Sequence, residues 1–164
     1  MIAARPIRSA PFADRCPKLW AGLALALLGA VFAPAAQALE FHSVAANGTV
    51  LYDAPSLKAS PLYIVSRYYP VEVVVSLEGW DKVRDVSGEL AWVEKKQLSD
   101  TRTVIVTVPL ADIRQAPDAG SPVLFRAERN VALEFLETTG TGWVKVKHRD
   151  GQIGYVLVTQ VWGA

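Results

Sequence analysis

Cysteine and histidine are scarce in this chain of 164 residues, and each scarcity excludes a kind of site. The single cysteine, Cys16, precedes the apolar segment near the N-terminus, so it is not a lipid-attachment cysteine and has no partner for a disulfide. The two histidines, His42 and His148, do not suffice for a zinc hydrolase site, which needs three protein ligands and a water molecule. We therefore expect no metal site and no cofactor, and we interpret both histidines as surface residues.

Motifs of catalysis are also missing from the sequence. No serine has the Gly-x-Ser-x-Gly context of a hydrolase nucleophile. Five acidic residues of the second half are scattered rather than arranged as a catalytic pair: Asp112, Asp118, Glu128, Glu134 and Glu137. We therefore predict that the protein is not an enzyme, and hydrolysis of a cell-wall substrate by the purified protein would overturn this prediction.

Long hydrophobic runs are absent apart from residues 19–32. Basic residues precede this run and small residues follow it: Arg5, Arg8, Arg15 and Lys18 before it, and Ala36-Gln37-Ala38 after it. This order is typical of a secretory signal peptide. The alternative is an uncleaved membrane anchor, but a spanning helix needs roughly 20 apolar residues and this run is shorter. We predict a signal peptide over residues 1–38, cleavage after Ala38, and a periplasmic or secreted protein with no stable membrane span after cleavage.

Positive charge is not in excess once the signal is removed. Loss of its four basic residues and of Asp14 leaves 13 basic and 15 acidic residues, a net charge of −2. Residues 39–101 carry six basic and nine acidic groups, whereas residues 102–164 carry seven and six. Nucleic-acid binding depends on clustered positive charge, so we expect no nucleic-acid partner.

The remaining chain contains an internal repeat. Three segments recur in the same order at nearly constant spacing: residues 79–84 (Gly-Trp-Asp-Lys-Val-Arg) as 142–147 (Gly-Trp-Val-Lys-Val-Lys), residues 87–93 as 150–156, and residues 51–55 as 113–117. Such ordered recurrence indicates a duplication. Two copies are too few for a solenoid and predict a tandem pair of domains.

Each copy has the pattern of a small all-β unit. Alternation over residues 70–77 and 131–135 predicts strands with one apolar face, formed by Val71, Val73, Val75 and Leu77 in the first copy and by Val131, Leu133 and Phe135 in the second. Ser87-Gly88 and Asp150-Gly151 are typical of hairpin turns, because glycine accepts the positive φ that such turns require. Short strands with tight turns in units of roughly 60 residues predict two small closed barrels.

The predicted domain boundaries follow from the repeat: one barrel over residues 39–100 and a second over residues 101–164. A unit of this size buries only about 60% of the surface of its unfolded chain and is marginally stable alone. We therefore expect the two barrels to pack on each other. The bridge over residues 98–102 is short and contains no glycine, which limits relative motion.

The repeated pattern Gly-Trp-x-Lys-Val, a glycine turn, and then Gly/Ala-Trp/Tyr-Val resembles the bacterial SH3 domain over nearly all of residues 41–164. Leu51-Tyr52-Asp53 is also similar to the first strand-loop signature of eukaryotic SH3 domains. The resemblance implies a five-stranded barrel with a long first loop. It also implies one of several uses, among them cell-wall peptide binding, targeting of enzymes and protein docking, so the fold alone does not settle the function.

Strand parity places a tryptophan on the outer face of each copy. If Val83 points inward, then Trp80 points outward with Lys82 and Arg84, and the same holds for Trp143 beside Val144. Exposed large aromatics usually mark contact surfaces. The resemblance adds three neighbours, and the resulting candidate ligand-binding residues are Tyr52, Trp80, Trp92, Trp143 and Tyr155. The alternative is that Trp80 and Trp143 cover the core edge or form the contact between barrels.

The departures from the eukaryotic SH3 pattern bear on the ligand. Its groove uses a proline and a tyrosine after the Trp92-like position, but this chain has Glu94 and Gln97 there, and Leu157 and Gln160 in the second copy. Arg114 replaces the aromatic residue that corresponds to Tyr52. Polyproline recognition requires parallel aromatic ridges, so a polyproline ligand is disfavoured and the first barrel is the better candidate.

Basic residues of the second barrel leave two interpretations open. Arg126, Arg129, Lys145, Lys147 and Arg149 form either a solvated face or a patch that binds carboxylates of wall peptides or an acidic partner. The sequence as a whole predicts a module that mediates protein–protein interaction in the cell envelope. The alternative is a peptidoglycan-binding module, and the expected partner is accordingly an envelope protein or a cell-wall peptide.

Overall fold

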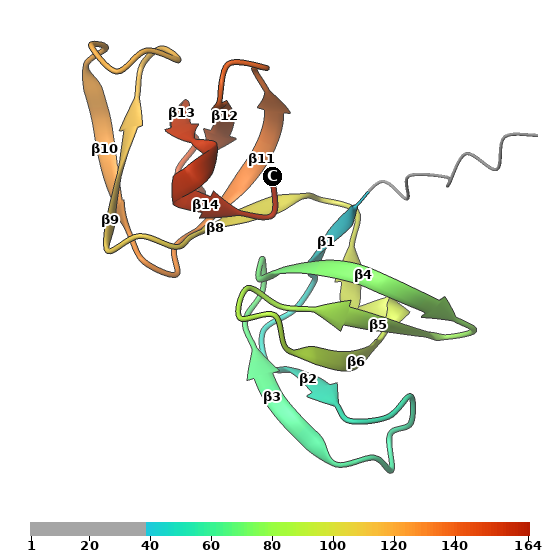
Figure 1. The fold of residues 1–164 in the computed structure, drawn as a ribbon. Coiled ribbons are helices and arrows are strands. Elements are labelled where there is room, and N and C mark those ends of the chain that lie inside the picture. The colour runs from blue at the N-terminus through green and yellow to red at the C-terminus, as the bar shows by residue number, and fades with distance from the viewer. Residues whose placement is uncertain (1–38) are drawn as a thin grey trace, which may run out of the picture. The chain divides into compact units, whose positions relative to one another are not determined.

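The computed structural model describes residues 39–164, and the predicted signal peptide and its cleavage site lie outside the described residues. Residues 38–164 belong to one compact unit, which contains two antiparallel sheets of seven strands each. Figure 1 shows that each sheet is formed by consecutive strands of the chain. No helix in this part of the chain is long and apolar enough to span a membrane.

The two sheets, called barrel 1 and barrel 2 below, have the same topology. Barrel 1 contains β1 (Glu40–Val44), β2 (Thr49–Tyr52), β3 (Pro61–Val65), β4 (Pro70–Leu77), β5 (Trp80–Arg84), β6 (Leu90–Glu94), the 3-10 helix η1 (Lys95–Gln97) and β7 (Leu98–Ser99). Barrel 2 contains β8 (Thr103–Val106), β9 (Leu110–Arg114), β10 (Val123–Glu128), β11 (Ala132–Thr138), β12 (Trp143–Lys147), β13 (Ile153–Leu157), the 3-10 helix η2 (Val158–Gln160) and β14 (Val161–Trp162). The strand order is β3-β2-β6-β5-β4-β1-β7 in one and β10-β9-β13-β12-β11-β8-β14 in the other. This one-to-one correspondence confirms the predicted all-β fold of two tandem SH3-like barrels.

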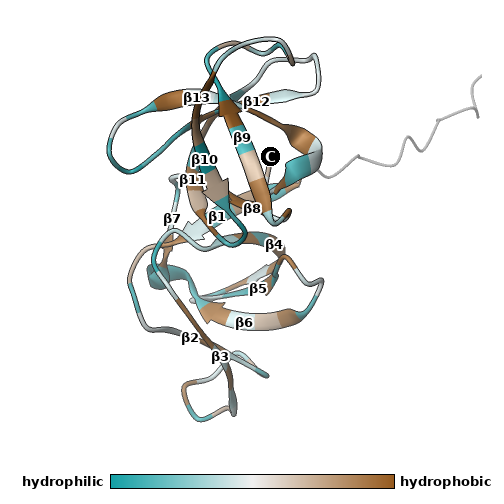
Figure 2. Ribbon diagram, turned by 90° about the vertical axis from the view of Figure 1, so that its left-hand side faces the viewer, coloured by the Kyte–Doolittle hydropathy of each residue, from teal (hydrophilic) through white to brown (hydrophobic). Residues whose placement is uncertain are grey.

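The valines that strand alternation predicts to point inward on β5 and β12, namely Val83, Val144 and Val146, are buried in the two cores. Val83 is buried, whereas Trp80, Lys82 and Arg84 on the opposite face are partly exposed. Figure 2 shows the same alternation as bands of apolar and polar colour along β6. The fully buried residues of the cores include Val44, Leu51, Val71, Val83 and Val93 in barrel 1, and Val104, Val106, Ile113, Leu133, Val144, Val146 and Val156 in barrel 2.

The predicted apolar face of β4 is wrong in its second half. The register of β4 against β5 shifts between Val73 and Val75, and Val75 and Leu77 are 42% and 45% exposed. A bulge inserts one extra residue and so breaks the alternation of faces, and it also bends the strand. The second half of β4 therefore leaves the core and has exposed side chains, although it remains paired with β5. The counterpart β11 has a shift between Phe135 and Glu137, and its predicted inward residues Leu133 and Phe135 still pack in or against the core.

The turns of the two copies correspond in backbone conformation. Gly88 and Gly151 have φ of 90° and 96°, which confirms the predicted glycine hairpin turns. Two residues other than glycine also have positive φ, Tyr68 at 69° and Asn130 at 68°. They occupy equivalent positions, because the N–H of Tyr68 donates to the Val44 carbonyl and that of Asn130 donates to the Val106 carbonyl. The left-handed conformation here is thus a feature of the duplicated unit.

The two barrels touch through residues that the sequence did not single out. The rings of Phe41 and Trp162 meet edge to face with centroids 5.2 Å apart, and Phe41 is 8% exposed. The Thr103 hydroxyl donates to the Tyr68 carbonyl at 2.8 Å. The expectation that the barrels pack on each other is therefore confirmed, and the aromatic contact involves Trp162 instead of Trp80 or Trp143.

Candidate functional site

Three of the predicted ligand-binding residues lie together on the outer face of barrel 1. Tyr52 at the end of β2 is paired with Trp92 on β6, and Trp92 is paired with Lys82 on β5. Paired residues of neighbouring strands lie side by side on one face of a sheet, so these side chains form a row across three strands. We call Tyr52, Trp92, Lys82 and the adjacent Trp80 the aromatic row.

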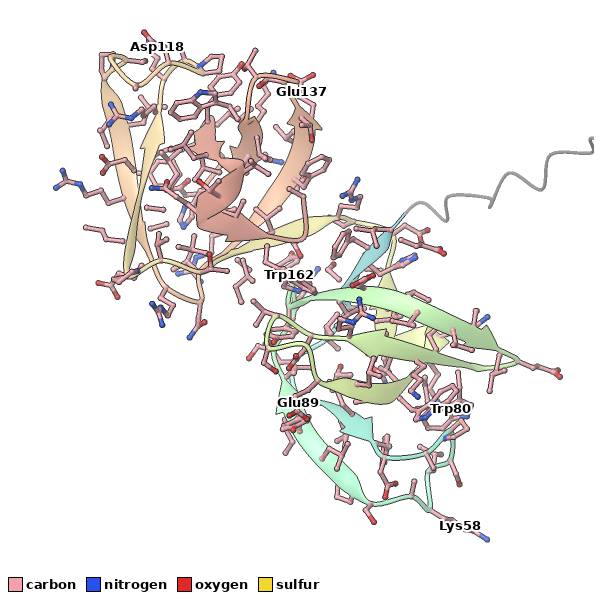
Figure 3. The ribbon with its side chains drawn as sticks, viewed as in Figure 1. Lys58, Trp80, Glu89, Asp118, Glu137 and Trp162 are labelled. Carbon is pink, nitrogen blue, oxygen red and sulfur yellow. The ribbon has the colours of Figure 1, made fainter. Side chains whose placement is uncertain are left out.

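Trp80 completes this surface from the start of β5. Its ring meets that of Tyr52 edge to face, with centroids 5.7 Å apart and planes at 82°. Figure 3 shows Trp80 on the side of barrel 1 that faces the loop between β2 and β3, where Lys58 lies. The Lys82 Nζ lies 5.8 Å from the centroid of the Trp92 ring, within the range of a cation–π contact. All four side chains are partly exposed, so the row offers aromatic faces and one cation to solvent.

A hollow of about 290 Å³ adjoins the row at Tyr52. Besides Tyr52, it is lined by the turn between β1 and β2, by Glu94 at the end of β6 and by Gln97 of η1. Glu94 and Gln97 are the residues that stand where a polyproline groove has proline and tyrosine, and Glu94 pairs with Lys96 at 2.8 Å. One wall of this hollow is thus aromatic and the other is polar.

Asp81 supports the aromatic row from beneath, and the sequence analysis did not identify it. It lies between Trp80 and Lys82 on β5, points inward and is 8% exposed. The Ser76 hydroxyl donates to its carboxylate at 2.7 Å, and the Lys95 ammonium lies 3.7 Å from it. Burial of a carboxylate at an inward strand position costs free energy unless the carboxylate is paired. The contacts of Asp81 with Ser76 and Lys95 therefore stabilise the β4–β5 turn, after which β5 begins at Trp80. The sequence signal that could have identified Asp81 is an acidic residue at a position where strand alternation predicts an inward side chain.

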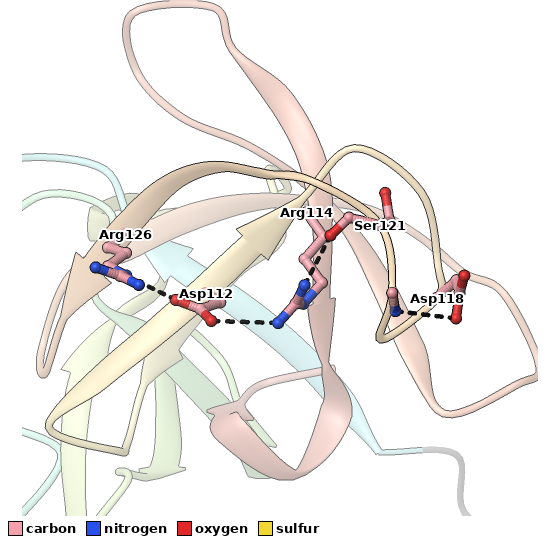
Figure 4. Close-up of polar contacts among 6 residues, drawn as sticks. Asp112, Arg114, Asp118, Ser121 and Arg126 are labelled. Atoms are coloured by element: carbon pink, nitrogen blue, oxygen red, sulfur yellow. Dashed lines mark hydrogen bonds and ion pairs between the residues drawn. The ribbon is translucent and has the colours of Figure 1, made fainter.

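The corresponding row of barrel 2 has a different chemistry. Arg114 on β9 is paired with Tyr155 on β13, and Tyr155 is paired with Lys145 on β12. The Arg114 guanidinium donates to the Ser121 carbonyl at 2.7 Å and lies 3.3 Å from Asp112, which also binds Arg126 at 2.9 Å (Figure 4). The Tyr155 ring thus lies between Arg114, which is paired with Asp112, and Lys145, which is paired with Glu137.

Trp143 is buried, which agrees with the alternative that it covers the edge of the core and not with exposure on a groove. It is 7% exposed although it begins β12 in the same place as Trp80 begins β5. Its carbonyl accepts hydrogen bonds from the Thr139 hydroxyl and the Thr139 N–H, both at 3.0 Å, and these bonds hold the β11–β12 turn at the start of the strand. Strand parity fixes the face on which a side chain lies but not what covers that face.

The predicted basic patch of barrel 2 is largely paired with carboxylates. The Lys145 ammonium lies 3.0 Å from Glu137, and this hydrogen bond with the adjacent negative charge raises the pKa of Lys145. Lys147 pairs with Glu134 at 3.2 Å, and Arg126 pairs with Asp112. These three cations are therefore parts of local ion pairs and do not act as one free patch.

Both histidines sit beside carboxylates. The His42 ring nitrogens lie 3.0 Å from Glu40 and 3.6 Å from Asp100, and His148 Nδ1 lies 2.9 Å from Asp150. Hydrogen bonds from Gln152 and then from His148 lower the pKa of Asp150. Within residues 39–164, no three His, Cys, Asp or Glu side chains come together as a metal-binding group.

The sequence matches known families in both barrels. A family model described as bacterial SH3 domain matches residues 45–100, and a second model with the same description matches residues 110–159, so the two together cover more than half of the chain. No curated protein matches the sequence.

Solved structures that match the chain include NlpC2 and NlpC1 from Trichomonas vaginalis and an NlpC/P60 family protein from Bacillus cereus ATCC 10987. Their identities to this chain are 22%, 19% and 17%, and the alignments cover 76%, 78% and 74% of it with TM-scores of 0.33, 0.34 and 0.31. The chain spans about half the length of these structures, at 48%, 47% and 55%.

Proposed function

Because the chain belongs to the bacterial SH3 domain family, with one domain in each barrel, we propose that it is an exported, non-enzymatic binding module that docks on a protein of the cell envelope. Bacterial SH3 domains are typically binding modules. The observation that carries the proposal is the aromatic row of barrel 1, which sets Trp92 between Tyr52 and Lys82 on an exposed sheet face.

The chemistry of the row suits an extended peptide segment. Partly exposed aromatic rings supply contact area at low cost in conformational entropy, and they are enriched in protein interfaces for that reason. Lys82 adds a cation at one end, which favours carbonyl or carboxylate groups of a partner. The hollow beside Tyr52 provides a recess for one side chain of that segment.

Barrel 1 is the better candidate because its row is free of competing partners. In barrel 2 the equivalent cations Arg114 and Lys145 are bound by Asp112 and Glu137, so a ligand must compete with them. In barrel 1 the cation of the row, Lys82, contacts the Trp92 ring. The surface of barrel 1 therefore meets a ligand at a smaller cost of rearrangement.

A second candidate ligand is a peptide of the cell wall. The pairing of Lys82 with Trp92 favours it, because wall peptides bear carboxylates beside short apolar side chains. Sedimentation of the purified protein with sacculi at low salt separates the two. A protein that remains in the supernatant argues for the envelope protein, and one that sediments argues for the wall.

Photocrosslinking from defined positions tests the docking site itself. A photoreactive amino acid at position 82 should capture a protein of discrete size in the intact envelope, whereas the same group at the equivalent position 145 of barrel 2 should not. Trp80→Ala should abolish capture from position 82 while leaving the melting temperature near that of the unmodified protein. Equal capture from positions 82 and 145 would contradict the assignment of the site to barrel 1. A large fall in the melting temperature of Trp80→Ala would show that Trp80 is structural.

A further inference from the structure

A cleft of about 420 Å³ lies where the two barrels meet, and the aromatic row has no part in it. Arg67 and Tyr68 line it from the β3–β4 turn, and Ser99, Thr101 and Thr103 line it from the segment that joins the barrels. Barrel 2 lines the cleft with Ala132 and Glu134 of β11, with Lys147 at the end of β12, and with His148 and Arg149 of the β12–β13 turn. Both barrels thus contribute to one recess.

The charge of this cleft is opposite to that of the protein around it. Three basic residues line the cleft, Arg67, Lys147 and Arg149, and only one acidic residue does, Glu134. Residues 39–164 as a whole carry a net charge of −2. Glu134 is paired with Lys147 at 3.2 Å. Within residues 39–164, neither Arg67 nor Arg149 has a carboxylate in ion-pairing range, so two guanidinium groups remain available. Local positive potential of this kind attracts anions.

The arginine on the side of barrel 1 is held in place by local contacts. The Arg67 guanidinium lies 4.6 Å from the centroid of the Tyr68 ring, and its backbone N–H donates to the Asn47 side chain at 2.9 Å. Tyr68 has a φ of 69°, and its carbonyl accepts the Thr103 hydroxyl. The β3–β4 turn, which the Thr103 hydroxyl contacts, therefore positions Arg67 at the cleft.

We propose that this cleft binds a carboxylate group of a peptide, with Arg67 and Arg149 as the groups that recognise it. A guanidinium presents its donors as a planar fork that matches a carboxylate, which makes arginine the residue best suited to this ligand. The hydroxyls of Ser99 and Thr101 supply further polar groups at the same wall. The carboxylate comes either from a wall peptide or from an acidic protein segment.

An NMR titration of the purified protein with three probes tests the site. The probes are a soluble muramyl-peptide fragment with free carboxylates, a linear L-peptide with two glutamates, and the same L-peptide with glutamine in place of glutamate. We expect carboxylate-bearing probes to shift the backbone amide signals of Arg67, Arg149 and Thr103, and the glutamine peptide to leave them unchanged. Shifts with the wall fragment alone assign the wall as the source, and shifts with the glutamate peptide alone assign an acidic protein.

Variants separate this site from general charge effects. Arg149→Ala should weaken the binding of the carboxylate-bearing probes about tenfold or more, which corresponds to the loss of a charge-assisted hydrogen bond. Lys58→Ala removes the same charge from the loop between β2 and β3 and should leave the affinity unchanged. Equal losses in the two variants, equal shifts with glutamate and glutamine peptides, or no shift with either carboxylate probe would overturn the proposal. The indole signals of Trp80 and Trp92 report the aromatic row in the same spectra, so the two sites are tested independently.

Discussion

Barrel 1 and barrel 2 have the same topology but a different surface chemistry at the same place. The outer row reads Tyr52–Trp92–Lys82 in one and Arg114–Tyr155–Lys145 in the other. Val83 in barrel 1 and Val146 in barrel 2 are both buried beneath the row, but barrel 1 has the buried Asp81 where barrel 2 has Val144. The comparison teaches that core positions and turns preserve this fold, while the outer face changes freely and carries any difference in ligand.

An ion pair between equivalent strands is repeated in both copies. Glu72 on β4 pairs with Arg84 on β5, and Glu134 on β11 pairs with Lys147 on β12, at 3.0 and 3.2 Å. The environments differ, because the Glu72 side chain is 10% exposed whereas that of Glu134 is 41% exposed. The same pair is therefore structural in barrel 1 and superficial in barrel 2.

The largest difference that we predict concerns the cores. Leu133→Ala in barrel 2 should lower the free energy of unfolding by about 2–5 kcal/mol, because it leaves a cavity at a residue that is 1% exposed. Val71→Ala at the equivalent position of barrel 1 removes a smaller side chain and should cost less, about 1.5–3 kcal/mol. Denaturant unfolding monitored by tryptophan fluorescence measures both. Leu136→Ala, at an exposed position of the same strand, is the control and should change stability little; an equal loss in all three variants would contradict the prediction.

Much of the fold could be predicted because it rests on local patterns. The glycine turns at Gly88 and Gly151, the inward position of Val83 and the order of the repeat follow from backbone sterics and strand alternation, which a sequence displays directly. The bulge at Val73–Val75 could not be predicted in this way, because it depends on how two strands meet. It is the reason that Val75 and Leu77 are exposed despite their apolar character.

The candidate site was only partly accessible to the same reasoning. Strand parity put Trp80 and Lys82 on one face, and the resemblance to SH3 domains put Tyr52 and Trp92 beside Trp80. The register of β2, β5 and β6 supplies the row in which Tyr52, Trp92 and Lys82 lie. The sequence left both exposure and packing open for Trp143, because strand parity gives the face of a side chain but not its burial. The contact of Phe41 with Trp162 was missed, because neither residue belongs to the repeated pattern.

The second prediction addresses the repeated ion pair. Arg84→Ala should cost about 2 kcal/mol of stability, because the carboxylate of Glu72 would remain nearly buried without its partner. Lys147→Ala should cost about 1 kcal/mol or less, since both members of that pair are well exposed. The double variants Glu72→Gln/Arg84→Ala and Glu134→Gln/Lys147→Ala complete two mutant cycles by denaturant unfolding. Similar coupling energies in the two cycles would show that the difference in exposure has no consequence.

The smallest effect that we predict concerns the contact between the edge strand and the hairpin turn of each barrel. In barrel 1 the Tyr63 hydroxyl donates to the Glu89 carboxylate at 3.0 Å, whereas in barrel 2 the equivalent Phe125 packs against His148 with ring centroids 5.5 Å apart. Figure 3 places Glu89 at the end of barrel 1 where β3 passes the β5–β6 turn. The hydrogen bond, and then the negative charge of Glu89, raise the pKa of Tyr63 above its ordinary value of 10.0.

A raised pKa in the folded state means that this tyrosine stabilises the fold below its ordinary pKa and loses that contribution as the pH rises through the folded value. Glu89→Gln supplies the residue that barrel 2 has at this position, Gln152, and should lower the pKa of Tyr63 towards 10.0. NMR titration of carbon-13-labelled tyrosine rings measures the change, with Tyr63→Phe to assign the signal. The pKa of Tyr69, which is raised mainly by burial, should stay the same in Glu89→Gln. A parallel fall at Tyr69 would indicate a general change in barrel 1 and would remove the hydrogen bond as the cause.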